Sequence, residues 1–234
     1  MRNGDFKLMM WKWLSHLIDV PIVRTSTSQN PELQLALSRG QWKLTTQGAI
    51  YSYGIYYSNF RDSFRILHKQ LEDADNCLVL GFGMGSIVLL LEREFKRPWT
   101  ILAVEHDKTI IELFTKYQQA SLESKVSFLE LDAAHLPQST QDSYDLICVD
   151  LFEDQFVPDF AQSTSYLLHL KSMLSDKGTL IFNRLAENEK DLKQNELFFS
   201  RAFSVVFPQA AILKLAANWM FVSHQTGTKH RNSV

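Results

Sequence analysis

The sequence has few cysteines and no excess of charge of either sign, and both features narrow what the protein can be. Only Cys77 and Cys148 occur in 234 residues, too few for a disulfide framework, so we expect a reducing, cytoplasmic location. With 24 basic and 26 acidic residues, the net charge of −2 gives no overall attraction to polyanions. We therefore expect no nucleic-acid partner.

Long uncharged apolar segments are also missing. The most apolar N-terminal stretch, residues 6–18, contains Lys7 and Lys12 and is too short to cross a bilayer, so no membrane span is expected. Trp11 and Trp13 leave two alternatives for this stretch. It is either an amphipathic helix that packs on its own domain, which we favour, or a segment that binds a membrane surface or a partner.

Histidines with the spacing of metal ligands are absent as well, so we expect no metal site. The seven histidines are scattered along the chain: His16, His68, His106, His135, His169, His224 and His230.

The first third of the chain predicts a small antiparallel β-meander. Between residues 22 and 53, short stretches of alternating polar and apolar residues are separated by turn signals at 38–40 and at Gln47 and Gly48. A helix from about residue 56 to 71 is expected to follow.

From Asn76 onward, buried apolar strands alternate with helical patterns, which indicates a parallel sheet. The expected strands are 77–80, 100–104, 126–131, 144–149 and 178–182, and the expected helices are 86–95, 108–120, 163–174 and 192–203.

The end of the chain contains two further strands, 211–215 and 219–223, separated by only three residues. A link that short cannot form a parallel crossover, so they are expected to pair as an antiparallel hairpin. The sequence thus predicts an α/β, Rossmann-like fold with a mostly parallel seven-stranded sheet, a terminal antiparallel hairpin and a small N-terminal β-meander. We expect three regions: 1–65, the N-terminal helix and meander; 66–225, the Rossmann-like domain; and 226–234, a flexible tail.

A glycine-rich turn joins the first strand of this sheet to its helix. Gly81, Gly83 and Gly85 follow Leu80 directly, and the helix is expected to begin at Ser86. Glycines permit positive φ and close approach of a ligand to the backbone. A tight turn without a ligand is the alternative explanation.

Acidic residues end the next three strands. Glu105 lies at the position where a carboxylate accepts hydrogen bonds from ribose hydroxyls, Asp132 and Ala133 follow the third strand, and Asp150 ends the fourth. The carboxyl ends of parallel strands meet at one edge of the sheet, where open α/β sheets bind ligands. For Asp132, a helix cap is nearly as good an explanation as a contact with adenine.

Together with the hairpin, these residues resemble the class I S-adenosylmethionine-dependent methyltransferases. The meander, the segment 79–86, the run Val104 to Asp107 and the run Tyr144 to Asp150 are similar to the spermidine synthase family. The resemblance implies that Gly81, Gly83, Gly85, Glu105, Asp132 and Ala133 bind S-adenosylmethionine or its decarboxylated form. It also implies that Asp150 is the catalytic residue, which attracts and deprotonates an amine acceptor.

Two departures from that family bear on the choice of donor. Met84 stands where the family has an acidic residue that holds the aminopropyl donor, and the chain after Leu151 lacks the family's polyamine-covering loop. Here Glu153, Asp154 and Asp159 instead make that loop acidic. We also expect exposed N–H groups of Gly83, Gly85 and the N-terminus of the following helix to bind the carboxylate of intact S-adenosylmethionine.

The sequence accordingly predicts a spermidine-synthase-like methyltransferase with a small acceptor, for which a cationic amine is the candidate, and a homodimer is the candidate assembly. Two alternatives stay open: a polyamine aminopropyltransferase, and a non-catalytic scaffold or regulator that kept the fold. Five aromatic residues are candidates for one wall of the acceptor pocket: Tyr51, Tyr53, Tyr56, Tyr57 and Phe60.

Overall fold

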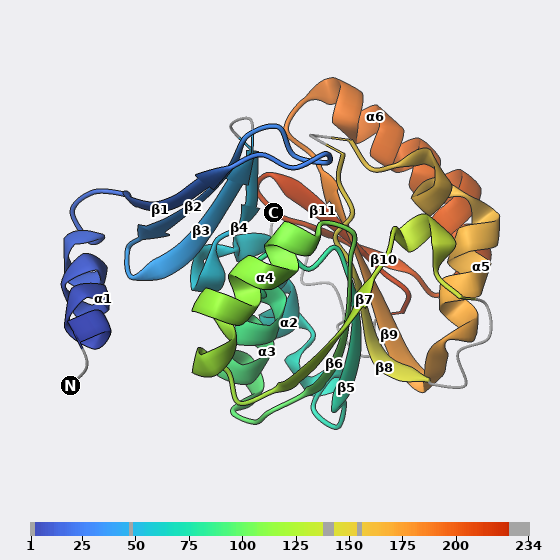
Figure 1. The fold of residues 1–234 in the computed structure, drawn as a ribbon. Coiled ribbons are helices and arrows are strands. Elements are labelled where there is room, and N and C mark those ends of the chain that lie inside the picture. Colours follow the sequence, from blue (N-terminus) through green and yellow to red (C-terminus); the bar gives the residue numbers. More distant parts are fainter. Residues whose placement is uncertain (1–2, 47–48, 138–142, 154–155, 225–234) are drawn as a thin grey trace, which may run out of the picture.

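The computed structural model describes residues 3–46, 49–137, 143–153 and 156–224. A seven-stranded sheet with the order β10-β11-β9-β8-β5-β6-β7 forms its centre (Figure 1). The strands are β5 (Asn76–Leu80), β6 (Thr100–Glu105), β7 (Lys125–Glu130), β8 (Tyr144–Val149), β9 (Leu174–Leu185), β10 (Ala211–Lys214) and β11 (Asn218–Val222). The predicted turn at Gln47 and Gly48 and the predicted tail lie outside the described residues.

The direction of the strands confirms the predicted fold class. β7, β6, β5, β8 and β9 run parallel, whereas β11 is antiparallel to both β9 and β10. The short link before β11 allows only this hairpin. The strand β5 is buried on both faces, as its continuous apolar sequence predicts, and Cys77 and Cys148 lie within the core on the adjacent strands β5 and β8.

Helices cover both faces of this sheet (Figure 1). α2 (Ser58–Ile66), α3 (Ser86–Phe95) and α4 (Lys108–Tyr117) lie on one face, and α5 (Thr164–Ser172) and α6 (Glu189–Phe198) lie on the other. A π-helical turn, η6 (Phe199–Phe203), continues α6 into α7 (Ser204–Val206). The remaining short 3-10 turns are η1 (Gly54–Tyr56), η2 (His68–Gln70), η3 (Gln119–Ser121), η4 (Ala133–His135) and η5 (Asp159–Gln162).

The N-terminal meander is a four-stranded antiparallel sheet with the order β1-β2-β3-β4. Its strands are β1 (Val20–Thr25), β2 (Leu33–Ser38), β3 (Gln41–Thr46) and β4 (Ala49–Ser52). The sequence did not identify β1 as a separate strand, because its residues alternate irregularly between half-buried and exposed positions and its pairing with β2 shifts register between Pro21 and Val23.

One apolar cluster joins the two sheets. Leu35 and Leu44 of the meander belong to the same buried cluster as Phe60, Val79 and Phe114 of the remainder. Burial of apolar surface is the main source of folding free energy, so this shared cluster holds the meander on the α3 and α4 side of the large sheet.

The N-terminal helix α1 (Asn3–Leu14) lies at the outer end of the meander (Figure 1). Trp11 packs against the apolar cluster, whereas the side chain of Trp13 is 69% exposed. The segment after α1 is attached to the β2–β3 turn, where the amide of Arg39 donates to the Ser15 carbonyl at 2.7 Å. Within the described residues, no helix is long and apolar enough to cross a membrane.

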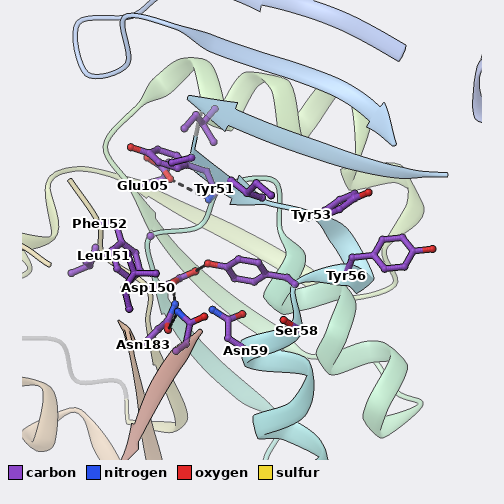
Figure 2. A pocket seen from close by; sticks show the side chains of 18 of the residues that line it. Tyr51, Tyr53, Tyr56, Ser58, Asn59, Glu105, Asp150, Leu151, Phe152 and Asn183 are labelled. Atoms are coloured by element: carbon purple, nitrogen blue, oxygen red, sulfur yellow. Dashed lines mark hydrogen bonds between the residues drawn. The ribbon is translucent and has the colours of Figure 1, made fainter. Parts of the chain in front are cut away.

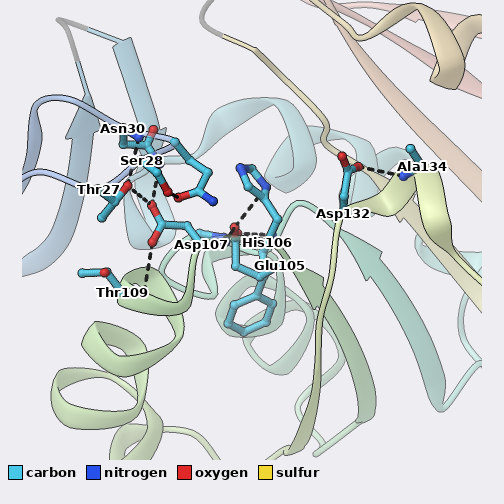
Figure 3. A network of polar contacts seen from close by, with 12 residues as sticks. Thr27, Ser28, Asn30, Glu105, His106, Asp107, Thr109, Asp132 and Ala134 are labelled. Carbon is cyan, nitrogen blue, oxygen red and sulfur yellow. Dashed lines mark hydrogen bonds and ion pairs between the residues drawn. The ribbon is translucent and has the colours of Figure 1, made fainter.

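A buried carboxylate connects the β1–β2 loop to the large sheet (Figure 3). Asp107 caps α4 by accepting from the Thr109 amide at 2.9 Å. Its second oxygen accepts from the Thr27 hydroxyl at 2.6 Å and from the Asn30 side-chain amide at 2.7 Å. Asn30 also borders the pocket at the carboxyl edge of the parallel strands.

Candidate functional site

A pocket of about 460 Å³ opens at the carboxyl edge of the parallel strands. The β4 strand, the η1 turn and the start of α2 form one side, and residues at or just beyond the carboxyl ends of β5, β6, β8 and β9 form the other (Figure 2). The lining includes four of the residues expected to form the site: Gly81, Gly83, Glu105 and Asp150.

Packing explains why two of these positions are glycine. Gly81 has φ of +81°, and a Cβ at this position would collide with the carbonyl oxygen of Asp150. Gly83 has φ of +55°, and a Cβ there would lie 3.1 Å from the Cβ of Ser52 in β4. Glycine is therefore needed for the close approach of β5, β8 and β4, whether or not a ligand is bound.

Glu105 is buried and holds the glycine turn in place. One carboxylate oxygen accepts from the amides of Phe82 at 3.3 Å and Gly83 at 3.2 Å, and the other accepts from the Asp107 amide at 3.0 Å. Burial raises the pKa of Glu105, while the amide of Asp107, the nearby His106 and the amides of Gly83 and Phe82 oppose that rise. The carboxylate also borders the pocket, so a ligand hydroxyl would meet an acceptor already fixed in position.

Asp150 lies at the end of β8 between two hydrogen-bond donors. The hydroxyl of Tyr57 donates to one of its oxygens at 2.7 Å, and the side-chain amide of Asn183 in β9 donates to the other at 2.8 Å. Figure 2 shows Asp150 and Asn183 at the base of the pocket. Asn183 is in turn oriented by Asn218, whose amide donates to its carbonyl oxygen at 2.9 Å.

The surroundings of Asp150 bring its protonation equilibrium close to neutrality. Burial raises the pKa of Asp150 to about 6, although the hydrogen bonds from Asn183 and Tyr57 lower it. At pH 7 to 8 the group is mainly a carboxylate, and it can accept a proton more readily than an ordinary aspartate. The pKa of Tyr57 is raised well above its usual value by burial and by Asp150, so Tyr57 stays a donor.

Four of the five aromatic candidates border the pocket: Tyr51, Tyr53, Tyr56 and Tyr57. Phe60 does not, because it is fully buried between the rings of Tyr57 and Phe64. The hydroxyl of Tyr53 is 2.6 Å from that of Ser38, which fixes this ring to the meander.

Asp132, Ala133 and Gly85 are not among the lining residues of this pocket. Asp132 caps η4 by accepting from the Ala134 amide at 2.8 Å (Figure 3). This is the capping role that was the alternative to a contact with adenine. Ala133 is buried, and its carbonyl accepts from the hydroxyl of Tyr166. Gly85 turns the chain into α3 with φ of +74° and packs against the ring of Phe114.

The glycine turn differs from expectation in two respects. The N–H groups of Gly83 and Gly85, expected to be exposed, are in use, because Gly83 donates to Glu105 and Gly85 donates to the carbonyl of Phe82. Met84 is 2% exposed and belongs to the core, so it does not face a donor molecule.

The pocket is anionic. Its lining contains the carboxylates of Glu105, Asp150 and Glu187, and among the described lining residues none is a lysine or arginine. Of the described side chains that line the pocket, the half-exposed imidazole of His106, 3.7 Å from Glu105, is the one able to carry positive charge. Such a pocket attracts cations and disfavours carboxylates.

Sequence reasoning missed the role of Asn183 and the specific role of Tyr57. Asn183 lies one residue beyond the predicted strand, and only the long β9 strand shows that it ends beside Asp150. Tyr57 was included as a pocket wall, and its pairing with Asp150 across 93 positions of sequence depends on how the meander docks. In the described chain no group of three histidine, cysteine or acidic side chains is arranged to hold a metal ion.

Comparison with known proteins supports this fold. No family model matches the sequence. A curated protein from Bifidobacterium longum, described as a probable polyamine aminopropyl transferase, is 25% identical over 130 residues. That match spans 56% of this chain and only 28% of the relative's length.

Solved structures show the same architecture at low sequence identity. A probable spermidine synthase from Corynebacterium glutamicum superposes with a TM-score of 0.69 and 15% identity, over 92% of this chain and 83% of the other. Human methyltransferase-like protein 13, crystallised with SAH, superposes with a TM-score of 0.55 and 23% identity, over 72% of this chain and 80% of the other. The match to the probable spermidine synthase covers 92% of this chain, and the unmatched part is shorter than the N-terminal sheet. The meander is therefore part of the structural similarity.

Proposed function

We propose that the protein is a transferase that moves an alkyl group from a sulfonium nucleoside of the S-adenosylmethionine type to an amine acceptor. We further propose that its donor is the decarboxylated form, so that the transferred group is aminopropyl. The observation that carries this proposal is the charge of the main pocket: three carboxylates line it, and none of its described lining residues is a lysine or arginine.

The donor's chemistry explains why pocket charge decides between the two forms. Intact S-adenosylmethionine carries a carboxylate, which needs a cation or free N–H groups, and the amides of Gly83 and Gly85 are already engaged. Decarboxylated donor has lost that carboxylate and keeps a cationic amine. Glu105 and Asp150 favour it electrostatically.

Gly81, Gly83 and Glu105 are the residues proposed to hold the nucleoside, with Tyr51 and Ile110 as apolar walls. The donor supplies an electrophilic carbon next to sulfonium, and the protein aligns the acceptor nitrogen with that carbon. Asp132 and Ala133 do not border the pocket, so we assign the adenine no contact with them.

Asp150 is the proposed catalytic base. An alkylamine with a pKa near 10 is protonated at pH 7 and cannot attack carbon until it loses a proton. The Asp150 carboxylate attracts the ammonium ion and accepts that proton. The nitrogen then forms the new C–N bond as the C–S bond breaks, which releases the neutral thioether nucleoside. Tyr57 and Asn183 keep both carboxylate oxygens in place throughout.

Calorimetric titration with three nucleosides tests the proposal. We expect decarboxylated S-adenosylmethionine to bind at least about tenfold more tightly than the intact form, a difference of about 1.4 kcal/mol. Methylthioadenosine, which has no charged arm, is the control for nucleoside binding. A protein that binds intact S-adenosylmethionine more tightly is a methyltransferase instead, and one that binds none of the three is a scaffold.

A matched pair of variants locates the preference. Glu187→Gln removes one exposed pocket carboxylate and should reduce the preference for the decarboxylated donor. Glu189→Gln removes an exposed carboxylate two residues away, outside the pocket lining, and should leave the preference unchanged.

A further inference from the structure

A second pocket of about 510 Å³ lies on the α5 and α6 side of the sheet. It is separate from the main pocket except at Phe152 and Leu185, which border both. One face of α6 and its π-helical continuation forms a wall of this second pocket, with Asp191, Asn195, Phe198 and Arg201 at successive turns.

Arg184 is the unusual residue of this second pocket. It is 5% exposed, lies in β9 next to Asn183, and belongs to a residue type that is seldom buried without an ion pair. Its Nε donates to Asn195 at 2.5 Å and one terminal nitrogen, Nη1, donates to Gln162 at 3.0 Å. The guanidinium carbon lies 4.6 Å from the centre of the Phe198 ring. The side chain is thus held rigidly on three sides.

No carboxylate among the described residues forms an ion pair with this guanidinium. Asp191 lines the second pocket, and one of its carboxylate oxygens, Oδ2, accepts from the Glu187 amide at 3.1 Å and the Asn188 side chain at 2.9 Å. Asp159 is exposed at the rim. Burial lowers the pKa of Arg184 to about 10, although the nearby negative charge of Asp191 opposes that fall, so Arg184 is charged at pH 7.

The remaining lining shows what kind of molecule would fit. Arg201 adds a second positive charge on an exposed part of the wall, and Phe152, Phe156, Val157 and Leu197 supply apolar surface. A rigid, desolvated guanidinium whose second terminal nitrogen, Nη2, has no hydrogen bond to the described residues is suited to a carboxylate or phosphate oxygen. We propose that this second pocket binds an anionic group, a carboxylate or a phosphate, carried on a small apolar or aromatic body, with Arg184 as its main contact and Arg201 as its second. This proposal does not depend on the transferase reaction.

Binding of simple probes tests the second pocket directly. Phenylacetate and phenyl phosphate are titrated against the folded, full-length protein by ligand-observed NMR, with phenylacetamide as the uncharged match for phenylacetate. We expect both anions to bind and the amide to bind at least about tenfold more weakly. Whichever anion binds more tightly distinguishes a carboxylate ligand from a phosphate ligand. Equal binding of phenylacetate and phenylacetamide would overturn the proposal.

Three variants locate the binding. Arg184→Gln should lower the affinity for both anions at least tenfold, and Arg201→Gln should lower it about threefold. Lys193→Gln removes one exposed positive charge from the same helix outside the pocket lining and should change nothing. Circular dichroism checks that each variant is folded. If Arg184→Gln does not fold, Arg201→Gln decides, because its side chain is exposed. Equal losses in Arg201→Gln and Lys193→Gln would reveal diffuse surface attraction and would also overturn the proposal.

Discussion

At the scale of single residues, the pairing of Tyr57 with Asp150 carries the most chemistry. A carboxylate that must attract and deprotonate an amine is useful only above its own pKa, which burial raises to about 6. The two hydrogen bonds from Tyr57 and Asn183 keep that value from rising further. Tyr57 and Asn183, which orient the proposed base, would therefore also set the pH range in which it works.

We predict that kcat/KM rises with pH along an acid limb with an apparent pKa of about 6, because Asp150 must be ionised. Tyr57→Phe removes a hydrogen bond that lowers the Asp150 pKa, so the limb should move to higher pH. Tyr56→Phe is the matched control, since Tyr56 lines the pocket without a hydrogen bond to Asp150 among those observed. The ¹³C carboxyl shift of Asp150 gives the same titration without an assay. If the apparent pKa of the acid limb is the same in Tyr57→Phe as in the wild type, Tyr57 does not lower the pKa of the titrating group.

The residue scale is also where sequence reasoning was weakest. The spacing of the sequence predicts that Glu105 lies at the end of β6. It does not predict that the amides of Phe82 and Gly83 donate hydrogen bonds to its carboxylate. The family resemblance placed Met84 where an acidic residue holds the donor, and the sequence alone gives no sign of which way this apolar side chain points. The core between α3 and the meander decides that it points inward.

At the scale of elements, the clearest feature is the β1–β2 loop, which is held to the large sheet by a buried carboxylate. Asp107 receives hydrogen bonds from Thr27 and Asn30 of the loop and from the start of α4. Three hydrogen-bond donors compensate for the burial of this carboxylate. If its charge is removed, the buried donors lose part of their hydrogen bonding, which costs free energy. The loop therefore depends on one side chain for its position.

We predict that Asp107→Asn lowers the free energy of unfolding by about 1 to 3 kcal/mol, the range for hydrogen bonds to a buried charged group. Backbone amides in residues 26–32 should exchange with solvent faster, as measured by hydrogen exchange and mass spectrometry. Asp19→Asn is the control, because it removes a half-exposed ion pair with Lys43 worth less than about 1 kcal/mol. Equal exchange in Asp107→Asn and the wild type would show that the loop is held by other contacts.

Most elements could be predicted from sequence, and the reason is periodicity. Helix α3 begins at Ser86 and ends at Phe95 as predicted, and β8 matches its apolar run from Tyr144 to Val149. β9 was predicted from residue 178 but begins at Leu174, because its first four residues are polar or half-buried. β1 was missed since its pairing, not its composition, makes it a strand.

At the scale of the whole molecule, the meander and the Rossmann-like part share one apolar cluster. The sequence predicted a boundary near residue 65, where the pattern of elements changes. Leu35 and Leu44 on one side of that boundary nevertheless pack in the same cluster as Phe82 and Phe114 on the other. Shared burial couples the stabilities of the two parts.

We predict one cooperative thermal transition for the full chain, with calorimetric and van't Hoff enthalpies equal within error. Leu44→Ala truncates a fully buried side chain of the meander and should lower the free energy of unfolding by about 2 to 5 kcal/mol. The protein should still unfold in one transition, at a lower temperature. Ile50→Ala, at an exposed position on the neighbouring strand, is the control. Two separated transitions would mean that the parts unfold independently.

The irregular edge of β1 bears on how copies of this chain can meet. β1 is the outermost strand of the meander, and an outer strand ordinarily offers a row of unpaired amides and carbonyls on which another chain can template. Here Pro21 lacks an N–H, and the register shifts before Val23. A foreign strand would find the row interrupted at these positions. Runaway sheet extension is therefore disfavoured on this side.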